Sequence, residues 1–143
     1  MSKAVLVSII IIVFIAIFLG VYFFIGNKGA FMGMKVETLK EAGSQAPSRQ
    51  VKTGDNITIQ YEIWLENGTK VYSSLDEGVP IDFQVGQSMA IKGFNIGFIG
   101  MKVGEKRRIT IPPELAFGEV GFPVAHIPPN ATLITEVELL KIN

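Results

Sequence analysis

Residues 90–121 read AIKGFNIGFIGMKVGEKRRITIPPELAFGEVG, and this stretch decides the fold because a helix, a strand and an abrupt stop follow one another in it. Phe94, Phe98 and Met101 recur at the i, i+4 and i+7 spacing of one helix face. The glycines at positions 93, 97 and 100 would each cost an isolated helix about 1 kcal/mol relative to alanine. We therefore expect this helix to be held by packing, with its glycines allowing close approach to a sheet. Residues 107–111 then alternate as a strand and stop at two prolines, after which Phe117 stands alone before a glycine.

Strand patterns occupy most of the region that follows residue 33. Residues 57–64 (ITIQYEIW) alternate apolar and polar side chains. The apolar face of this run consists of Ile57, Ile59, Tyr61 and Ile63. The pair Asn67-Gly68 follows, and it predicts a β-hairpin because both residues tolerate a positive φ. Val71 and Tyr72 begin the return strand.

The end of the chain is a third strong strand candidate. Residues 133–139 place Leu133, Thr135, Val137 and Leu139 on one face, with glutamates on the other. Residues 34–38 are a weaker candidate that is typical of an edge strand. The sequence therefore predicts an α+β domain at residues 34–143, in which a curved antiparallel sheet wraps over one short α-helix.

A long apolar run precedes this domain. Residues 4–25 (AVLVSIIIIVFIAIFLGVYFFI) contain no charge, and at 1.5 Å per residue a helix of 22 residues spans roughly 33 Å, enough for a bilayer core of about 30 Å. The sequence predicts an N-terminal transmembrane anchor at residues 1–25 and a glycine-rich linker at residues 26–33 (GNKGAFMG). The lipid bilayer is thus an expected partner, through residues 4–25.

A cleaved signal peptide is the alternative for this segment. Its apolar region would be about 7–15 residues long and would end in a small-x-small site, whereas this run is longer and Phe24 and Lys28 stand where small residues are needed. Lys3 and the terminal amine on one side oppose Lys28, Lys35 and Lys40 on the other, so the positive-inside rule does not settle the orientation. We expect a single-pass membrane protein whose globular domain lies on the exported side, periplasmic or extracellular.

Composition excludes several classes of function. The 143 residues carry 13 basic and 13 acidic side chains, so no excess of positive charge points to nucleic acid. The chain has no cysteine and one histidine, which excludes thiol catalysis and argues against a catalytic triad or a histidine metal cluster. We expect no metal and no cofactor.

The polar motifs favour structural roles. Lys106, Arg107 and Arg108 alternate sides on a strand and do not form one phosphate-binding patch, so a solvated sheet edge is the preferred interpretation. Three Asn-x-Thr tripeptides, which begin at residues 56, 67 and 130, suit turns and strand starts. His126 is predicted to be a loop or rim residue.

From about Met34 to the end, the sequence resembles the FKBP (immunophilin) family of peptidyl-prolyl cis–trans isomerases. The matching stretches are YEIWLENGTKVYSS, residues 80–121 and IPPNATLITEVELLKIN, in the family's order. The resemblance implies a half-open sheet curled around one helix, an apolar pocket between them, and proline-containing polypeptides as substrates. It also implies that macrolide ligands of the family bind, although more weakly.

The resemblance assigns residues to the pocket. It implies catalytic roles for Tyr61, Ile91, Phe94 and Phe117, with the Ile91 N–H holding the ligand carbonyl and Phe94 on the floor. It implies substrate contacts for Val71, Tyr72, Ile81, Phe83, Phe122, Ile127 and Thr135.

Several of these positions depart from the family pattern. The usual Phe-Asp pair before two serines is Val71-Tyr72, the usual tyrosine is Phe117, and aromatic residues are replaced by Ile81 and Thr135. Isomerisation transfers no proton, so these losses weaken catalysis and do not abolish it. The alternatives are a binding or chaperone module for proline-containing or apolar segments, without catalysis, and a membrane-tethered structural domain with a collapsed pocket.

Overall fold

The computed structural model describes residues 33–87 and 90–143. The predicted anchor at residues 1–25 lies outside these residues, as does the predicted linker apart from Gly33. Within the two described ranges, no helix has the length and apolar character that a membrane crossing requires.

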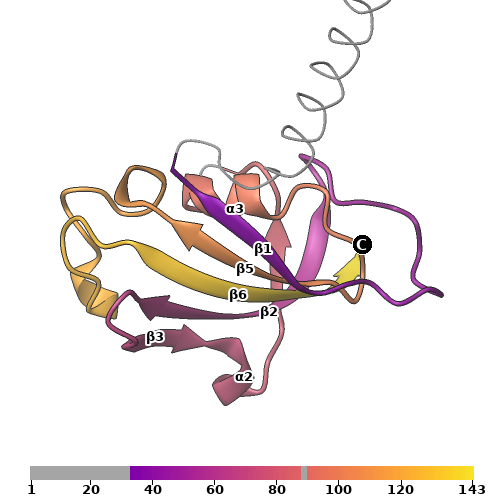
Figure 1. Ribbon diagram of the computed structural model, residues 1–143, viewed down its shortest axis with the longest axis horizontal. Helices are drawn as coiled ribbons and strands as arrows, with labels where there is room; N and C mark the ends of the chain where they lie inside the picture. Colours follow the sequence, from indigo (N-terminus) through magenta and orange to yellow (C-terminus); the bar gives the residue numbers. More distant parts are fainter. Residues whose placement is uncertain (1–32, 88–89) are drawn as a thin grey trace, which may run out of the picture. The chain divides into compact units, whose positions relative to one another are not determined.

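The described residues form one antiparallel sheet with short helices (Figure 1). Its strands are β1 (Lys35–Lys40), β2 (Asn56–Leu65), β3 (Lys70–Ser73), β4 (Ile81–Gln84), β5 (Lys106–Ile111) and β6 (Leu133–Ile142). The spatial order is β1-β5-β6-β2-β3, and β4 also pairs with β2. This confirms the predicted class of an antiparallel sheet with few helices.

Strand β2 has two partners along a single edge. Its first half pairs with β4, from Asn56 opposite Gln84 to Ile59 opposite Ile81. Its second half pairs with β3, beginning at Glu62 opposite Ser73. The other edge of β2 pairs with β6 over almost its full length. Between β3 and β4 the chain leaves the sheet, and helix α2 (Ser74–Glu77) lies in that break.

The β2–β3 hairpin forms where Asn67-Gly68 predicts it, but with a longer turn. The Leu65 N–H donates to the Thr69 carbonyl and the Gly68 N–H donates to the Leu65 carbonyl, which makes a three-residue loop. Within this loop, only Gly68 has a positive φ, of 84°. This is the geometry of a type I turn followed by one left-handed residue, in which Asn67 needs no positive φ.

Helix α3 (Lys92–Gly97) packs against the face of the sheet that carries the core. A Cβ built on Gly97 would lie 2.6 Å from Cδ1 of Ile109, and a Cβ on Gly93 would collide with Cγ2 of Ile111. Ile109 and Ile111 are fully buried on β5. The predicted reason for the glycines, close approach of helix to sheet, is therefore confirmed for Gly93 and Gly97, whereas Gly100 takes a left-handed φ of 77°.

The core lies under this face and follows the predicted alternation. Leu133, Thr135, Val137 and Leu139 of β6 are all buried, and the residues between them are more exposed. Phe98 and Met101, which continue the helical spacing beyond α3, are also fully buried. Strand β1 is at one end of the strand order, as its weaker pattern predicted.

Three features differ from the sequence-based expectation. Besides α3, the described residues include α2 and two 3₁₀ turns, η1 (Pro113–Leu115) and η2 (Pro123–Ala125), all too short to show a helical period. Strand β4 was not predicted. The basic run at 106–108 lies on β5, which is flanked by β1 and β6, and is therefore not at an edge. Lys106 and Arg108 there share Glu136 of β6, at 2.8 and 2.6 Å.

Candidate active site

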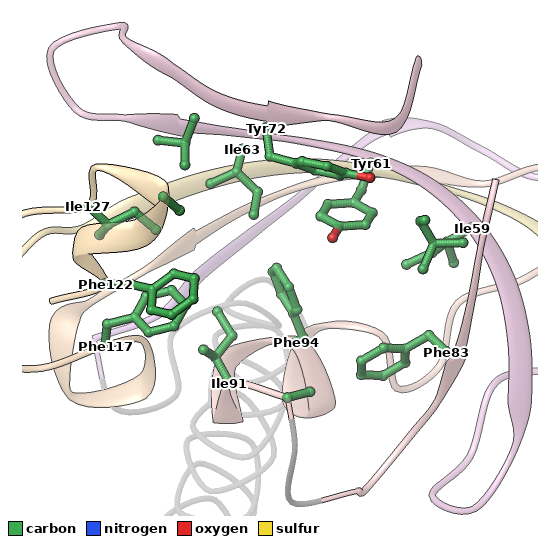
Figure 2. Close-up of a pocket in the computed structure, with 14 residues that line it drawn as sticks. Ile59, Tyr61, Ile63, Tyr72, Phe83, Ile91, Phe94, Phe117, Phe122 and Ile127 are labelled. Carbon is green, nitrogen blue, oxygen red and sulfur yellow. The ribbon is translucent and has the colours of Figure 1, made fainter. Parts of the chain in front are cut away.

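An apolar cavity of about 510 Å³ opens between the sheet and α3 (Figure 2). Apart from two tyrosines, every side chain that lines it is aliphatic or a phenylalanine. The lining residues are Ile59, Tyr61, Ile63, Val71, Tyr72, Ile81, Phe83, Ala90, Ile91, Phe94, Phe117, Phe122, Ala125 and Ile127. Such a space accepts an apolar group and excludes water.

Three rings from three elements meet in this cavity. The Tyr61 ring of β2 lies 5.7 Å from the Phe94 ring of α3, edge to face, and the Phe83 ring of β4 lies 6.5 Å from Phe94 in the same arrangement. Figure 2 shows Tyr61, Phe83 and Phe94 pointing into the same space. Phe94 stacks on the buried Phe98 at 5.3 Å, so the floor of the cavity rests directly on the core.

Tyr61 is held in place by a side chain that substitutes for a missing strand partner. Tyr61 lies on β2 between the part that pairs with β4 and the part that pairs with β3. The Tyr61 N–H donates to Oγ of Ser74 at 2.9 Å, and the same Oγ donates to the Tyr61 carbonyl at 3.2 Å. Ser74 is fully buried. One serine thus satisfies both backbone groups of Tyr61 and fixes its ring towards the cavity.

Ile91 immediately precedes α3. Its φ of −60° and ψ of 144° are extended, so Ile91 lies just outside the helix, where it lines the cavity. Among the residues that the structure describes, no backbone carbonyl accepts from the Ile91 N–H. The role of this N–H in holding a ligand carbonyl stays a prediction.

The opposite rim is built by residues 116–132, which we call the rim loop. The two prolines end β5, η1 buries Leu115, and the Gly118 N–H donates to the Pro113 carbonyl at 2.9 Å, which turns Phe117 towards the cavity. Phe117 stacks on Phe122 at 5.1 Å with an 8° angle between the rings. The rim is therefore a double aromatic layer without a hydroxyl.

Backbone pairing closes the rim loop. Phe122 and Ile127 exchange two hydrogen bonds, of 2.9 and 3.1 Å, across η2. A Cβ on Gly121 would lie 2.5 Å from the Ile127 carbonyl oxygen, so the loop closes only with glycine at this position. His126 takes a left-handed φ of 56°, is exposed, and does not line the cavity.

The polar end of the cavity consists of Tyr61, Tyr72 and Glu77, which we call the acidic lip. The two tyrosine rings lie 5.2 Å apart, and the Tyr72 hydroxyl donates to Oε2 of Glu77 at 2.9 Å. Burial and the hydrogen bond to Glu77 raise the pKa of Tyr72 to about 12. Burial, with the Glu77 charge nearby, also raises the pKa of Tyr61. Both hydroxyls therefore stay protonated at neutral pH.

The family model for FKBP-type peptidyl-prolyl cis-trans isomerase matches residues 47–140, which carry every lining residue of the cavity. The chain belongs to this family. It is 51% identical over 92 residues to FK506-binding protein 1 of Saccharomyces cerevisiae, and these residues make up 64% of this chain and 80% of that protein. It is 46% identical over 110 residues to the FK506-binding protein of Neisseria meningitidis serogroup B, which covers 77% and 96%.

Two further matches extend the comparison. FK506-binding protein 2 of Yarrowia lipolytica is 35% identical over 137 residues, which are 96% of this chain and 92% of that protein. The crystal structure of FkpA from Escherichia coli superposes with a TM-score of 0.69 at 33% identity. That match covers 81% of this chain and 51% of FkpA, so the chain spans about half of the FkpA length.

The structure gathers every predicted pocket residue except Thr135 around the cavity of this isomerase. Thr135 is buried on β6 between Ile63 and Ile109 of the neighbouring strands and does not line the cavity. Its Oγ1 has no hydrogen-bond partner. The sequence had placed it correctly on the inward face, but that face extends beyond the cavity.

Sequence reasoning missed four lining residues and one acid. Ile59 and Ile63 share the face of Tyr61, so the alternation of β2 already contained the signal. No sequence signal marked Ala90 or Ala125. No carboxylate lines the cavity, in keeping with Val71-Tyr72 at the place of the usual Phe-Asp pair, but α2 brings Glu77 to the hydroxyl of Tyr72.

The arrangement suits isomerisation without chemical participation. Rotation about a prolyl amide must overcome a barrier of about 18–20 kcal/mol that resonance imposes, and the planar amide is more dipolar than the twisted one. An apolar cavity that excludes water destabilises the planar form more, and this difference accelerates rotation. Among residues 33–87 and 90–143, no cluster of His, Cys, Asp or Glu could hold a metal ion.

Proposed function

We propose that this isomerase acts on Xaa-Pro bonds of protein substrates near a membrane, where it assists their folding. We also propose that its activity is weaker than that of a pocket with the family's usual aromatic and acidic residues. The open cavity in which Tyr61, Phe83 and Phe94 meet is the observation that carries the catalytic part of the proposal. The reduced rate follows from the rim, where Phe117 has no hydroxyl, and from the aliphatic side chains of Val71 and Ile81.

The position near a membrane rests on the sequence of residues 4–25, an uncharged run long enough to cross a bilayer. A membrane-bound domain meets unfolded segments while they emerge beside the bilayer, when prolyl isomerisation limits folding. We place the domain on the exported side.

The relatives named for FK506 lead to a proposal about ligands. We propose that this chain binds FK506 through the same cavity, with lower affinity because Phe117 and Val71 supply fewer contacts. Calorimetric titration of the full chain with FK506 measures this, and an affinity equal to that of the Saccharomyces cerevisiae protein would contradict it.

A second candidate function is the holding of apolar or proline-containing segments without acceleration. The rim loop favours it, because Val120 and Val124 are 78% and 84% exposed beside the half-exposed Phe122. An exposed apolar surface next to an open cavity can retain an unfolded segment.

One experiment separates these functions. The full chain in lipid nanodiscs is mixed with a proline peptide, and exchange NMR measures the cis–trans rate while fluorescence anisotropy measures binding. Acceleration supports the isomerase. Binding at the uncatalysed rate supports the holding function, and the absence of both supports a structural domain. Protease digestion of spheroplasts or intact cells tests the topology, since an exported domain is cut without lysis.

A further inference from the structure

The acidic lip contains a carboxylate that the isomerase mechanism does not use. Helix α2 carries this carboxylate, and its single turn is capped at both ends. The Ser73 hydroxyl accepts from the Asp76 N–H at 3.1 Å at its start, and Gly78 ends it with a left-handed φ of 70°. Lys70 binds Asp76 at 2.9 Å, while the next residue, Glu77, binds the Tyr72 hydroxyl.

The Glu77 carboxylate keeps its charge uncompensated. Within the described part of the chain, no Lys, Arg or His nitrogen lies within ion-pair distance of it, and Tyr72 is its one side-chain donor. Its second oxygen therefore remains available as an acceptor. Glu77 is exposed, so a ligand can reach it from the mouth of the cavity.

The neighbouring elements do not neutralise this charge. On β3, Lys70 already pairs with Asp76 at 2.9 Å and Glu62 at 3.4 Å. On β4, Asp82 alternates with the cavity residues Ile81 and Phe83, and accepts from Thr58. On α3, Lys92 follows the cavity residue Ile91 but lines an adjoining depression together with Glu114, and does not line the cavity itself.

We propose that Glu77 selects prolyl substrates that carry a lysine or arginine next to the proline. This deepens the proposed function, on which it rests, by naming the substrate class of the same cavity. The proline ring occupies the apolar space, and the stem of a flanking lysine or arginine lies along the Tyr72 ring while its charge meets Glu77. The two tyrosine rings also present faces that attract a cation.

The lip is open to solvent, so its effect is modest and depends on salt. Exposed ion pairs change affinity by about 2- to 5-fold, and high ionic strength screens them. We therefore expect a preference of about 2- to 5-fold for a basic flanking residue over an uncharged one of equal length, and the reverse for an acidic one.

The test uses the full chain in lipid nanodiscs and peptides that differ at one position. Ala-Xaa-Pro-Phe and Ala-Leu-Pro-Xaa are prepared with lysine, norleucine or glutamate at Xaa, because norleucine keeps the lysine stem without its charge. Exchange NMR gives kcat/KM, and anisotropy of labelled peptides gives Kd. The two series show on which side of the proline the preference lies.

Three variants assign the preference to the lip. Glu77→Gln is expected to bring the lysine-to-norleucine ratio close to one, and Glu77→Lys to reverse it in favour of glutamate. Glu66→Gln makes the same chemical change on the β2–β3 hairpin, away from the cavity, and is expected to keep the wild-type ratio.

The outcomes separate this inference from the proposed function. If peptides are accelerated with no charge preference, or with a preference that Glu77→Gln retains, the inference is wrong and the isomerase stands. If lysine peptides bind more tightly through Glu77 but none is accelerated, the inference stands and catalysis is wrong. If no peptide binds and none is accelerated, both are wrong.

Discussion

Phe117 and Phe122 show how single residues set the chemistry of the rim. Their rings stack at 5.1 Å, and neither offers a hydrogen bond to a substrate carbonyl. The floor beneath is a similar stack of Phe94 on Phe98. A substrate thus meets ring faces and aliphatic walls, and hydroxyls only at the acidic lip.

Phe117→Tyr is expected to raise kcat/KM. The new hydroxyl adds one hydrogen bond at the rim, worth about 0.5–1.5 kcal/mol, which corresponds to roughly 2- to 13-fold. Exchange NMR on an Ala-Leu-Pro-Phe peptide measures the rate, and Phe117→Leu, which removes the ring, should lower it. A tyrosine variant no faster than the wild type would show that the rim does not limit catalysis.

Thr135 is a second case in which one atom matters. Its Oγ1 is buried without a partner, and such a group costs about 1–3 kcal/mol. Thr135→Val removes the hydroxyl and keeps the shape, so we expect the free energy of unfolding to rise by about 1–2 kcal/mol. Thr38→Val, the same change at an exposed position of β1, should shift it by less than about 0.5 kcal/mol. Chemical denaturation measures both, and equal shifts would contradict the role of burial.

At the scale of elements, the break in the β2 edge shapes the end of the cavity that holds the acidic lip. Strands β3 and β4 pair with successive halves of β2, and α2 occupies the gap between them. A continuous edge strand would bind the Tyr61 backbone directly and leave no place for α2. The break therefore brings Ser74 and Glu77 to the cavity together.

Ser74→Ala removes both hydrogen bonds to the Tyr61 backbone. Because the site is buried, we expect a loss of about 1–3 kcal/mol in stability, and a lower kcat/KM because the Tyr61 ring is no longer fixed. Thermal unfolding and the peptide assay measure the two effects. Ser48→Ala, at an exposed loop position, is the matched control and should change neither. Full activity in Ser74→Ala would show that β2 positions Tyr61 without help.

The close contact of α3 with β5 makes alanine at Gly97 destabilising, although alanine is the better helix former. Alanine favours a helix by about 1 kcal/mol over glycine, but a Cβ at Gly97 would lie 2.6 Å from Cδ1 of the buried Ile109. We expect Gly97→Ala to lose about 1–3 kcal/mol of stability, the usual cost of overpacking.

A second substitution tests the cause. Ile109→Val removes the colliding Cδ1 and should rescue Gly97→Ala. Ile111→Val should not rescue Gly93→Ala, because valine keeps the Cγ2 that collides there. Gly43→Ala, where no atom lies within 4 Å, is the control. Denaturation midpoints measure each variant. If Ile109→Val fails to rescue Gly97→Ala, or Ile111→Val rescues Gly93→Ala, close helix–sheet contact is not the reason for these glycines.

At the scale of the whole molecule, the chain divides into residues 1–30 and 31–143. The second unit contains the sheet, the cavity and the acidic lip. The family model lies entirely within this unit, whereas the Yarrowia lipolytica protein matches over 96% of the chain. The catalytic part and the predicted anchor are thus separable in sequence.

A chain that begins at Met34 is expected to keep the wild-type kcat/KM on short peptides and to lose its association with lipid vesicles. The full chain should float with the vesicles. The double substitution Ile12→Arg with Phe14→Arg should reduce the fraction that floats, because each arginine at the centre of a span costs about 2.5–3.5 kcal/mol. Vesicle flotation and the peptide assay measure the two properties. A truncated chain that still floats would overturn the proposed anchor.

Local pattern in the sequence determined much of this protein. Alternation in residues 57–64 and 133–139 predicted the strands and their buried face, and the spaced glycines predicted the close approach of α3. These signals are strong because they depend on neighbours within a few positions along the chain, where side-chain direction follows from backbone period alone. The resemblance then identified ten of the fourteen residues that line the cavity.

Only the tertiary structure decided the rest. The single turn of α2 has too few residues for a period, so nothing in the sequence showed that Glu77 would meet the Tyr72 hydroxyl. Strands β3 and β4 share one edge of β2, and the gap between them lets Ser74 bind the Tyr61 backbone. Which strands pair is set by packing between segments that are distant in sequence, so the sequence pattern did not show it. For the same reason Thr135, although correctly placed on the inward face, lies in the core and not in the cavity.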